Sequence, residues 1–77
     1  MNNNRRKEIK NVIDQIENLK DILETIRDDE QESYDNMPEG LQASERGEAS
    51  EAAIDNLDAA LDSFDELVDG LSEAIGG

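Results

Sequence analysis

The stretch that decides the fold is Ile54–Ile75, which reads IDNLDAALDSFDELVDGLSEAI. Its large apolar residues recur at alternating spacings of three and four, the spacing of a helix that lies against another helix. They are Ile54, Leu57, Leu61, Phe64, Val68, Leu71 and Ile75. The pattern therefore predicts a long helix with one continuous apolar seam.

A row of carboxylates runs beside this seam with the same alternating spacing. Its members are Glu48, Glu51, Asp55, Asp58, Asp62, Asp65 and Asp69. Exposed helices usually mix acidic residues with Lys or Arg at four-residue spacing, but the chain has no basic residue after Arg46. We expect the row to bind a partner. The alternative is a solvated face that only confers solubility.

The first half of the chain carries a matching seam, with the same spacing of three and four. It consists of Ile9, Val12, Ile16, Leu19, Leu23 and Ile26. Pro38 ends this helix, because proline and the residue before it are disfavoured inside helices. We expect a single domain over residues 1–77, with a helix at about 5–36, a turn at about 37–43 and a helix at about 44–75. The seam turns polar after Ile26, which leaves open whether residues 28–50 are fully helical.

The two seams fit together when the chain folds back on itself near Gly40. Facing positions then have residue numbers with a constant sum, as in the pair Ile16 and Phe64. The same register places Glu30 opposite Ser50, and Ser33 opposite Gly47. The predicted fold class is all-α, an antiparallel two-helix hairpin of the coiled-coil type.

Several apolar residues lie beside the seams, among them Ile22, Ala60 and Leu67. They widen each apolar stripe beyond what a contact between two helices needs. We therefore expect two hairpins to pair as a homodimeric four-helix bundle. The alternative is a hairpin that docks on a partner. The basic cluster of Arg5, Arg6, Lys7 and Lys10 is expected opposite Asp69 and Glu73, at the negative end of the second helix dipole.

The composition excludes several classes of function. The chain has 77 residues, 21 acidic and 7 basic, with a net charge of −14 and neither Cys nor His. A Ser-His or Cys-His nucleophile pair is therefore absent, and the acidic run at residues 28–32 lacks the spacing of a calcium-binding loop. We expect no enzymatic activity, no cofactor and no dedicated metal site.

The same charge balance predicts the kind of partner. Strong acidity disfavours direct binding to nucleic acid or to an anionic membrane and favours a basic protein surface. No apolar run approaches the length of a membrane span, and the N-terminus lacks the apolar core of a secretory signal. We expect a cytoplasmic protein.

The segment at residues 29–48, DEQESYDNMPEGLQASERGE, resembles a stretch in small acidic proteins encoded by phages and prophages of Gram-positive bacteria. It covers about a quarter of the chain, and no functional residue carries over from it. The resemblance implies a phage or mobile-element origin. Such an origin favours a small inhibitor of a host protein in the host cytoplasm, for example of a defence nuclease or a DNA-repair enzyme. Together with the acidic row, it leads us to expect a protein that mimics DNA and blocks the basic, nucleic-acid-binding surface of a host protein. The alternative is a structural or oligomerisation module whose charges only solvate it.

Overall fold

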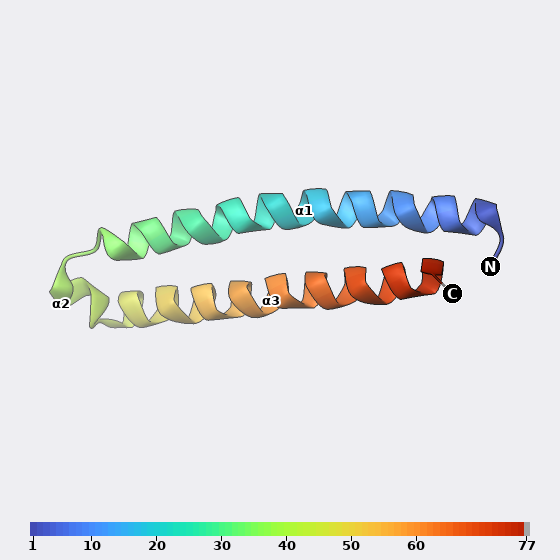
Figure 1. Cartoon of the computed structure of the whole chain (residues 1–77). Helices are drawn as coiled ribbons and strands as arrows, with labels where there is room; N and C mark the ends of the chain where they lie inside the picture. Colours follow the sequence, from blue (N-terminus) through green and yellow to red (C-terminus); the bar gives the residue numbers. More distant parts are fainter. Residues whose placement is uncertain (77) are drawn as a thin grey trace.

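Two long helices run antiparallel along the molecule and are joined by a short third helix (Figure 1). The computed structural model describes residues 1–76 and shows α1 at Asn3–Asp35, α2 at Glu39–Gln42 and α3 at Glu45–Gly76. The rod measures 58 × 15 × 12 Å, and both ends of the chain lie at the end opposite α2. The predicted all-α helical hairpin is confirmed.

The first helix begins two residues earlier than expected because Asn2 caps it. The Asn2 side chain accepts a hydrogen bond of 2.8 Å from the backbone N–H of Arg5, which satisfies one of the unpaired donors at a helix start. Residues 28–35 are helical throughout, and the helix ends at Asp35, three residues before Pro38. Asn3 and Asn4, which the expected helix at about 5–36 left out, therefore belong to α1.

The turn contains a short helix, α2, that the sequence did not predict. Pro38 provides its N-cap, and the Pro38 carbonyl accepts hydrogen bonds from the backbone N–H groups of Leu41 and Gln42. The Gln42 side chain then donates to the Tyr34 carbonyl at 2.9 Å. The Tyr34 carbonyl, which lies at the end of α1, also accepts from the Met37 backbone N–H at 3.0 Å. The Gln42 bond to it ties α2 to the main rod.

Gly47 allows α2 to lie directly against the start of α3. A Cβ atom at Gly47 would lie 2.0 Å from the Gln42 backbone oxygen, so only glycine fits there. Gly47 is buried by this contact, whereas Ser33 is exposed. Gly47 is covered by the backbone of α2, and the expected pairing of Ser33 with Gly47 stays a prediction.

The contact between α1 and α3 keeps the predicted register but uses a different side of α1. Ser50 donates a hydrogen bond of 2.6 Å to Glu30, as the register required. The predicted seam residues Val12, Leu19 and Ile26, however, are about half exposed. Ile9, Ile16 and Leu23 still face α3. The residues that face α3 beside them are the half-buried Ile13, Lys20 and Arg27, each of which follows one of the exposed seam residues in the sequence.

This rotation of α1 follows from the charges on α3. Lys20 and Arg27 can cover the seam with their methylene groups while their charged ends reach carboxylates of α3. Apolar side chains at Leu19 and Ile26 would gain burial in the seam but would leave those carboxylates without cations. The observed arrangement combines both long side chains with their acidic partners on α3.

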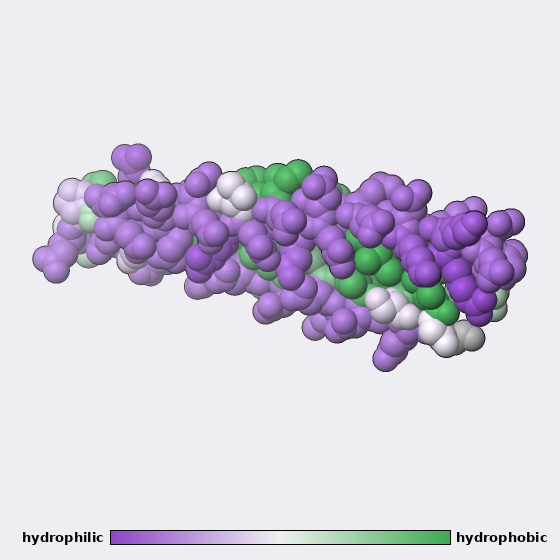
Figure 2. All heavy atoms as spheres, turned by 45° about the horizontal axis from the view of Figure 1, so that its top comes forward, coloured by the Kyte–Doolittle hydropathy of each residue, from purple (hydrophilic) through white to green (hydrophobic). Residues whose placement is uncertain are grey.

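The interior of the hairpin is thin. Only Ile16 and Ile54 are buried apolar residues in the described chain, at 9 % and 6 % exposed. The other seam residues of α3, such as Leu61 and Phe64, are half-buried. Figure 2 shows apolar atoms reaching the surface at the edge of α1 near the middle of the rod and between the helices toward the chain ends.

Candidate functional site

The predicted acidic row separates into two lines in the structure. We call Glu51, Asp58 and Asp65 the paired acidic line, because each contacts a side chain of α1. We call Glu48, Asp55, Asp62 and Asp69 the free acidic line. The members of each line are seven residues apart, so each line follows one edge of α3.

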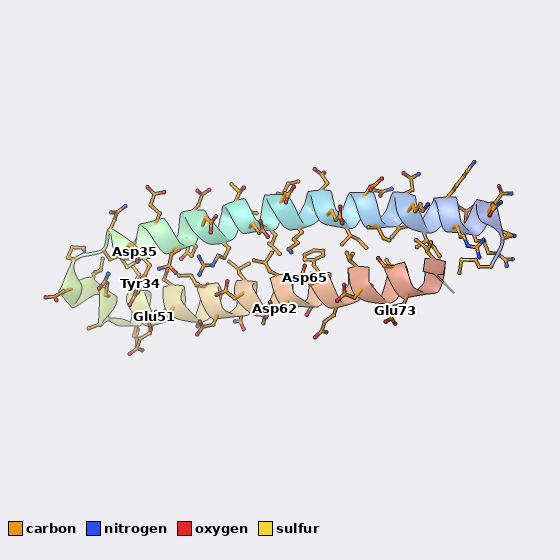
Figure 3. All side chains as sticks on the ribbon, in the orientation of Figure 1. Tyr34, Asp35, Glu51, Asp62, Asp65 and Glu73 are labelled. Carbon is orange, nitrogen blue, oxygen red and sulfur yellow. The ribbon has the colours of Figure 1, made fainter. Side chains whose placement is uncertain are left out.

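The paired acidic line holds the two long helices together on one side of the rod. Asp65 accepts from Lys20 at 2.5 Å, and Asp58 accepts from the Nε atom of Arg27 at 2.8 Å. Glu51 accepts a hydrogen bond from the Tyr34 hydroxyl. In Figure 3, Tyr34 and Glu51 point toward one another near α2, and Asp65 points toward α1. These three carboxylates therefore have an internal structural role.

The same contacts shift the titration of the groups on α1. The hydrogen bond to Asp65 raises the pKa of Lys20, and the hydrogen bond to Asp58 raises the pKa of Arg27. The hydrogen bond to Glu51 raises the pKa of Tyr34, because the carboxylate accepts from the protonated phenol, and partial desolvation raises it further.

The free acidic line is open to solvent. All four of its residues are exposed, and within residues 1–76 none of them lies in a hydrogen bond or an ion pair through its side chain. Asp62, a member of this line, projects from α3 on the side away from α1, as does Glu73 (Figure 3). The free line therefore presents carboxylates that form no ion pair with a cation of residues 1–76.

A shallow groove of about 530 Å³ lies beside the Lys20–Asp65 pair. Its lining includes Glu17, Glu24 and Asp69, so carboxylates of both long helices border it. In the described residues, no group of three or more acidic side chains converges closely enough to hold a metal ion. The groove extends the acidic surface from α3 onto α1.

The basic cluster at the start of α1 lies beside the end of α3, but it does not contact the carboxylates that we expected as its partners. Arg6 donates from its Nε atom to the Ile75 carbonyl at 3.3 Å. This carbonyl lies at the C-terminal end of α3, where helical donors run out, and the positive charge of Arg6 interacts favourably with the helix dipole there. Within residues 1–76, no ion pair joins the cluster to Asp69 or Glu73.

The roles of Lys20, Arg27 and Tyr34 were missed from the sequence. All three residues sit at the same position of three consecutive heptads, and so do their acidic partners on α3. A search for opposite groups at the flanking positions of an antiparallel pair would have found them.

Comparisons with known proteins add no assignment, since no family model, no curated protein and no solved structure matches the chain. The resemblance of residues 29–48 to phage and prophage proteins stays a prediction. Within residues 1–76, none of the helices combines the length and the apolar character needed to span a bilayer.

Proposed function

We propose that this protein is a non-enzymatic interaction protein that binds a basic protein surface through the free acidic line. The observation that carries this proposal is the exposure of Glu48, Asp55, Asp62 and Asp69 without any cation partner in the described chain. Four unneutralised carboxylates along one helix edge attract a basic surface over long range and speed association with it. The phage resemblance adds the specific form of the proposal, an inhibitor that occupies the nucleic-acid-binding surface of a host enzyme.

The division of the acidic row changes how such mimicry would work. Carboxylates seven residues apart are spaced by about 10.5 Å along a helix, given a rise of 1.5 Å per residue. One DNA strand presents a phosphate about every 3.4 Å, so the free line alone is sparser than DNA. A DNA-like charge density would therefore need neighbouring exposed carboxylates as well, such as Glu66 and Glu73 on α3.

The test compares two variants of equal charge. The first replaces the free acidic line by amides, with Glu48→Gln, Asp55→Asn, Asp62→Asn and Asp69→Asn. The matched control changes four exposed carboxylates of α1 that make no side-chain hydrogen bond or ion pair within residues 1–76 and lie outside the acidic groove, with Glu8→Gln, Asp14→Asn, Asp29→Asn and Glu32→Gln. Asp58 and Asp65 are left intact, because their loss would break contacts to α1.

Proteins captured from a Gram-positive bacterial lysate at low salt would be identified and titrated with each variant. We expect the wild-type protein and the control to bind alike, and the free-line variant to bind at least about tenfold more weakly. We also expect added salt to weaken binding, and DNA to compete for the captured protein. Equal binding by both variants would show that the free line is not the contact.

A second candidate function is an oligomerisation module. The observation that favours it is the set of large apolar residues that remain about half exposed, including Leu19, Ile26 and Leu67. We propose that the hairpin pairs with a second copy to form a four-helix bundle, and such pairing is compatible with the acidic function. If pairing is the whole function, amides in the free acidic line would leave both assembly and activity unchanged.

A further inference from the structure

One side of α1 carries no charge over most of its length. Between Ile9 and Arg27, every charged residue lies on one half of the helix surface, the half that includes Lys20, Glu17 and Asp21. The remaining outward positions are all neutral, and they include the large apolar residues that the hairpin leaves open. They are Asn11, Val12, Gln15, Asn18, Leu19, Ile22, Thr25 and Ile26.

The third helix has a matching neutral side. Between Ala49 and Ala74, the residues on this side are Ala49, Ala53, Asn56, Ala60, Ser63, Leu67, Gly70 and Ala74, and none of them is charged. Both long helices turn their neutral sides in the same direction, because Lys20 and Arg27 meet Asp65 and Asp58 on the opposite side of the seam. We call these two sets of eight residues together the charge-free face.

The large apolar residues of the charge-free face are open to solvent in the single chain. Its members Val12, Leu19, Ile22, Ile26 and Leu67 are between 46 and 53 % exposed. A shallow hollow of about 360 Å³ lies on it, lined by Ala60, Ser63, Phe64 and Leu67. Figure 2 shows part of this apolar surface at the edge of α1. Exposed apolar surface of this extent, bordered by polar residues, marks an interaction site.

The size of the face fits a homodimer. About 20 residues of each long helix at a rise of 1.5 Å give a length of about 30 Å, and two helices of about 10 Å give a width of about 20 Å. A flat footprint of about 600 Å² per chain corresponds to about 1,200 Å² in total, the lower end for a stable and specific interface.

We infer that the charge-free face is the surface on which a second copy of this chain binds. This inference rests on the homodimer proposed above and assigns its interface. A chain with a net charge of −14 can pair with itself only if its carboxylates stay apart, and face-to-face packing of the charge-free faces directs both acidic surfaces outward. The pairing also supplies the interior that the hairpin lacks, since only Ile16 and Ile54 are buried apolar residues within residues 1–76.

The charges exclude the other common occupants of an apolar face. A basic partner gains nothing from a surface without carboxylates. Helices that lie on membranes carry Lys and Arg on their polar side, whereas the polar side of this rod is acidic and is repelled by anionic lipids. In the dimer, the two free acidic lines face away from each other, so one dimer presents two acidic surfaces to two partner molecules.

The test uses two neighbouring alanines that lie on different sides of α3. Ala60→Glu adds a carboxylate in the middle of the charge-free face, whereas Ala59→Glu adds the same charge on the exposed acidic side. Sedimentation equilibrium of the full chain should give about twice the chain mass of 8.6 kDa for the wild type and for Ala59→Glu. Ala60→Glu should weaken dimerisation at least about a hundredfold, because each dimer would bury two unpaired carboxylates.

The remaining outcomes separate failure of the interface from failure of the dimer. A wild-type chain that is fully helical and monomeric at 100 µM would overturn both. A dimer that both alanine variants form equally well would overturn the charge-free face alone. If Ala60→Glu unfolds, Ile22→Glu takes its place, because Ile22 lies on the same face and is 52 % exposed in the single chain. It should weaken dimerisation in the same way, and a dimer as tight as that of the wild type would overturn the inference. Anionic phosphatidylglycerol vesicles should leave the wild-type helicity and mass unchanged, and vesicle binding in place of dimerisation would contradict the inference.

Discussion

At the scale of single residues, Gly47 is the position that the tertiary structure restricts most tightly. Its backbone is helical, so a sequence reading counts it only as a weak helix former. In the structure, the Gln42 backbone approaches so closely that no side chain fits. The close approach lets α2 fold against α3 and sets where the chain turns back.

We predict that Gly47→Ala destabilises the protein by about 1–3 kcal/mol, the usual effect of overpacking. The added Cβ would lie 2.0 Å from a backbone oxygen, and moving α2 would weaken the Gln42 bond to Tyr34. Urea unfolding followed by circular dichroism measures the effect. Gly40→Ala is the matched control, because a Cβ there meets nothing within 4 Å and should change stability by less than about 0.5 kcal/mol. Equal stability of the two variants would contradict the packing at Gly47.

A second prediction at this scale concerns alkaline pH. The pKa values of Lys20 and Tyr34 are raised in the folded chain. Their contacts therefore contribute stability below the unfolded pKa values, about 10 for Tyr and about 10.4 for Lys, and that stability is lost as the pH rises through the folded values. We expect the melting temperature to hold steady from about pH 7 to pH 9 and to fall above about pH 10.

The control for this pH effect is the double variant Lys20→Met with Tyr34→Phe, which removes both titrating groups and keeps comparable side-chain volume. Its melting temperature should fall less steeply above pH 10 than that of the wild type. Identical profiles would show that neither contact is coupled to folding.

At the scale of the helices, the orientation of α1 decides which residues the hairpin buries. Val12 and Ile13 are adjacent in the sequence, yet Ile13 is half-buried beside α3 and Val12 is 46 % exposed. The paired acidic line selects this orientation, because it draws Lys20 and Arg27 toward α3. The same rotation leaves Leu19 and Ile26 on the charge-free face.

We predict that Ile16→Ala and Ile54→Ala each destabilise the protein by about 2–4 kcal/mol, the usual range for removing buried methylene groups. Both residues are less than 10 % exposed. Leu41→Ala, at 38 % exposed in α2, should have roughly half that effect, because water already covers part of the side chain. Urea unfolding gives all three values, and a larger effect at Leu41 than at Ile54 would contradict the seam described here.

At the scale of the whole molecule, charge is distributed by side as well as by sequence. In the central parts of α1 and α3, all charged residues lie on the half of each helix that includes the ion pairs of Lys20 and Arg27. The rod therefore has an acidic surface and a charge-free face on opposite sides. This division lets one chain use two separate surfaces, one for a basic partner and one for its own copy.

We predict that salt stabilises the protein, because a net charge of −14 opposes folding more strongly than the exposed ion pairs support it. The melting temperature should rise between 20 mM and 500 mM NaCl. The variant with Asp55→Asn, Asp62→Asn and Asp69→Asn should melt higher at low salt and should respond less to added salt. A melting temperature that falls with salt would show that the ion pairs of Lys20 and Arg27 dominate.

Much of the fold follows from short-range patterns. The seam of α3 and the end of the first helix before Pro38 were predicted, because heptad spacing and proline sterics act locally. The pairing of Glu30 with Ser50 was predicted as well, because the two heptads match when the chain folds back near Gly40. The acidic row was also found, but its division into paired and free lines was not. That division depends on which cations of α1 come within reach of α3.

The sequence by itself determined that the chain is a helical hairpin with an acidic edge, since periodicity and charge are properties of each helix alone. Only the tertiary structure decided the rotation of α1, the close contact at Gly47 and the carboxylates that remain free. The physical reason is that each of these features depends on two segments meeting: a side chain at a flanking heptad position is exposed or paired according to what the other helix places beside it.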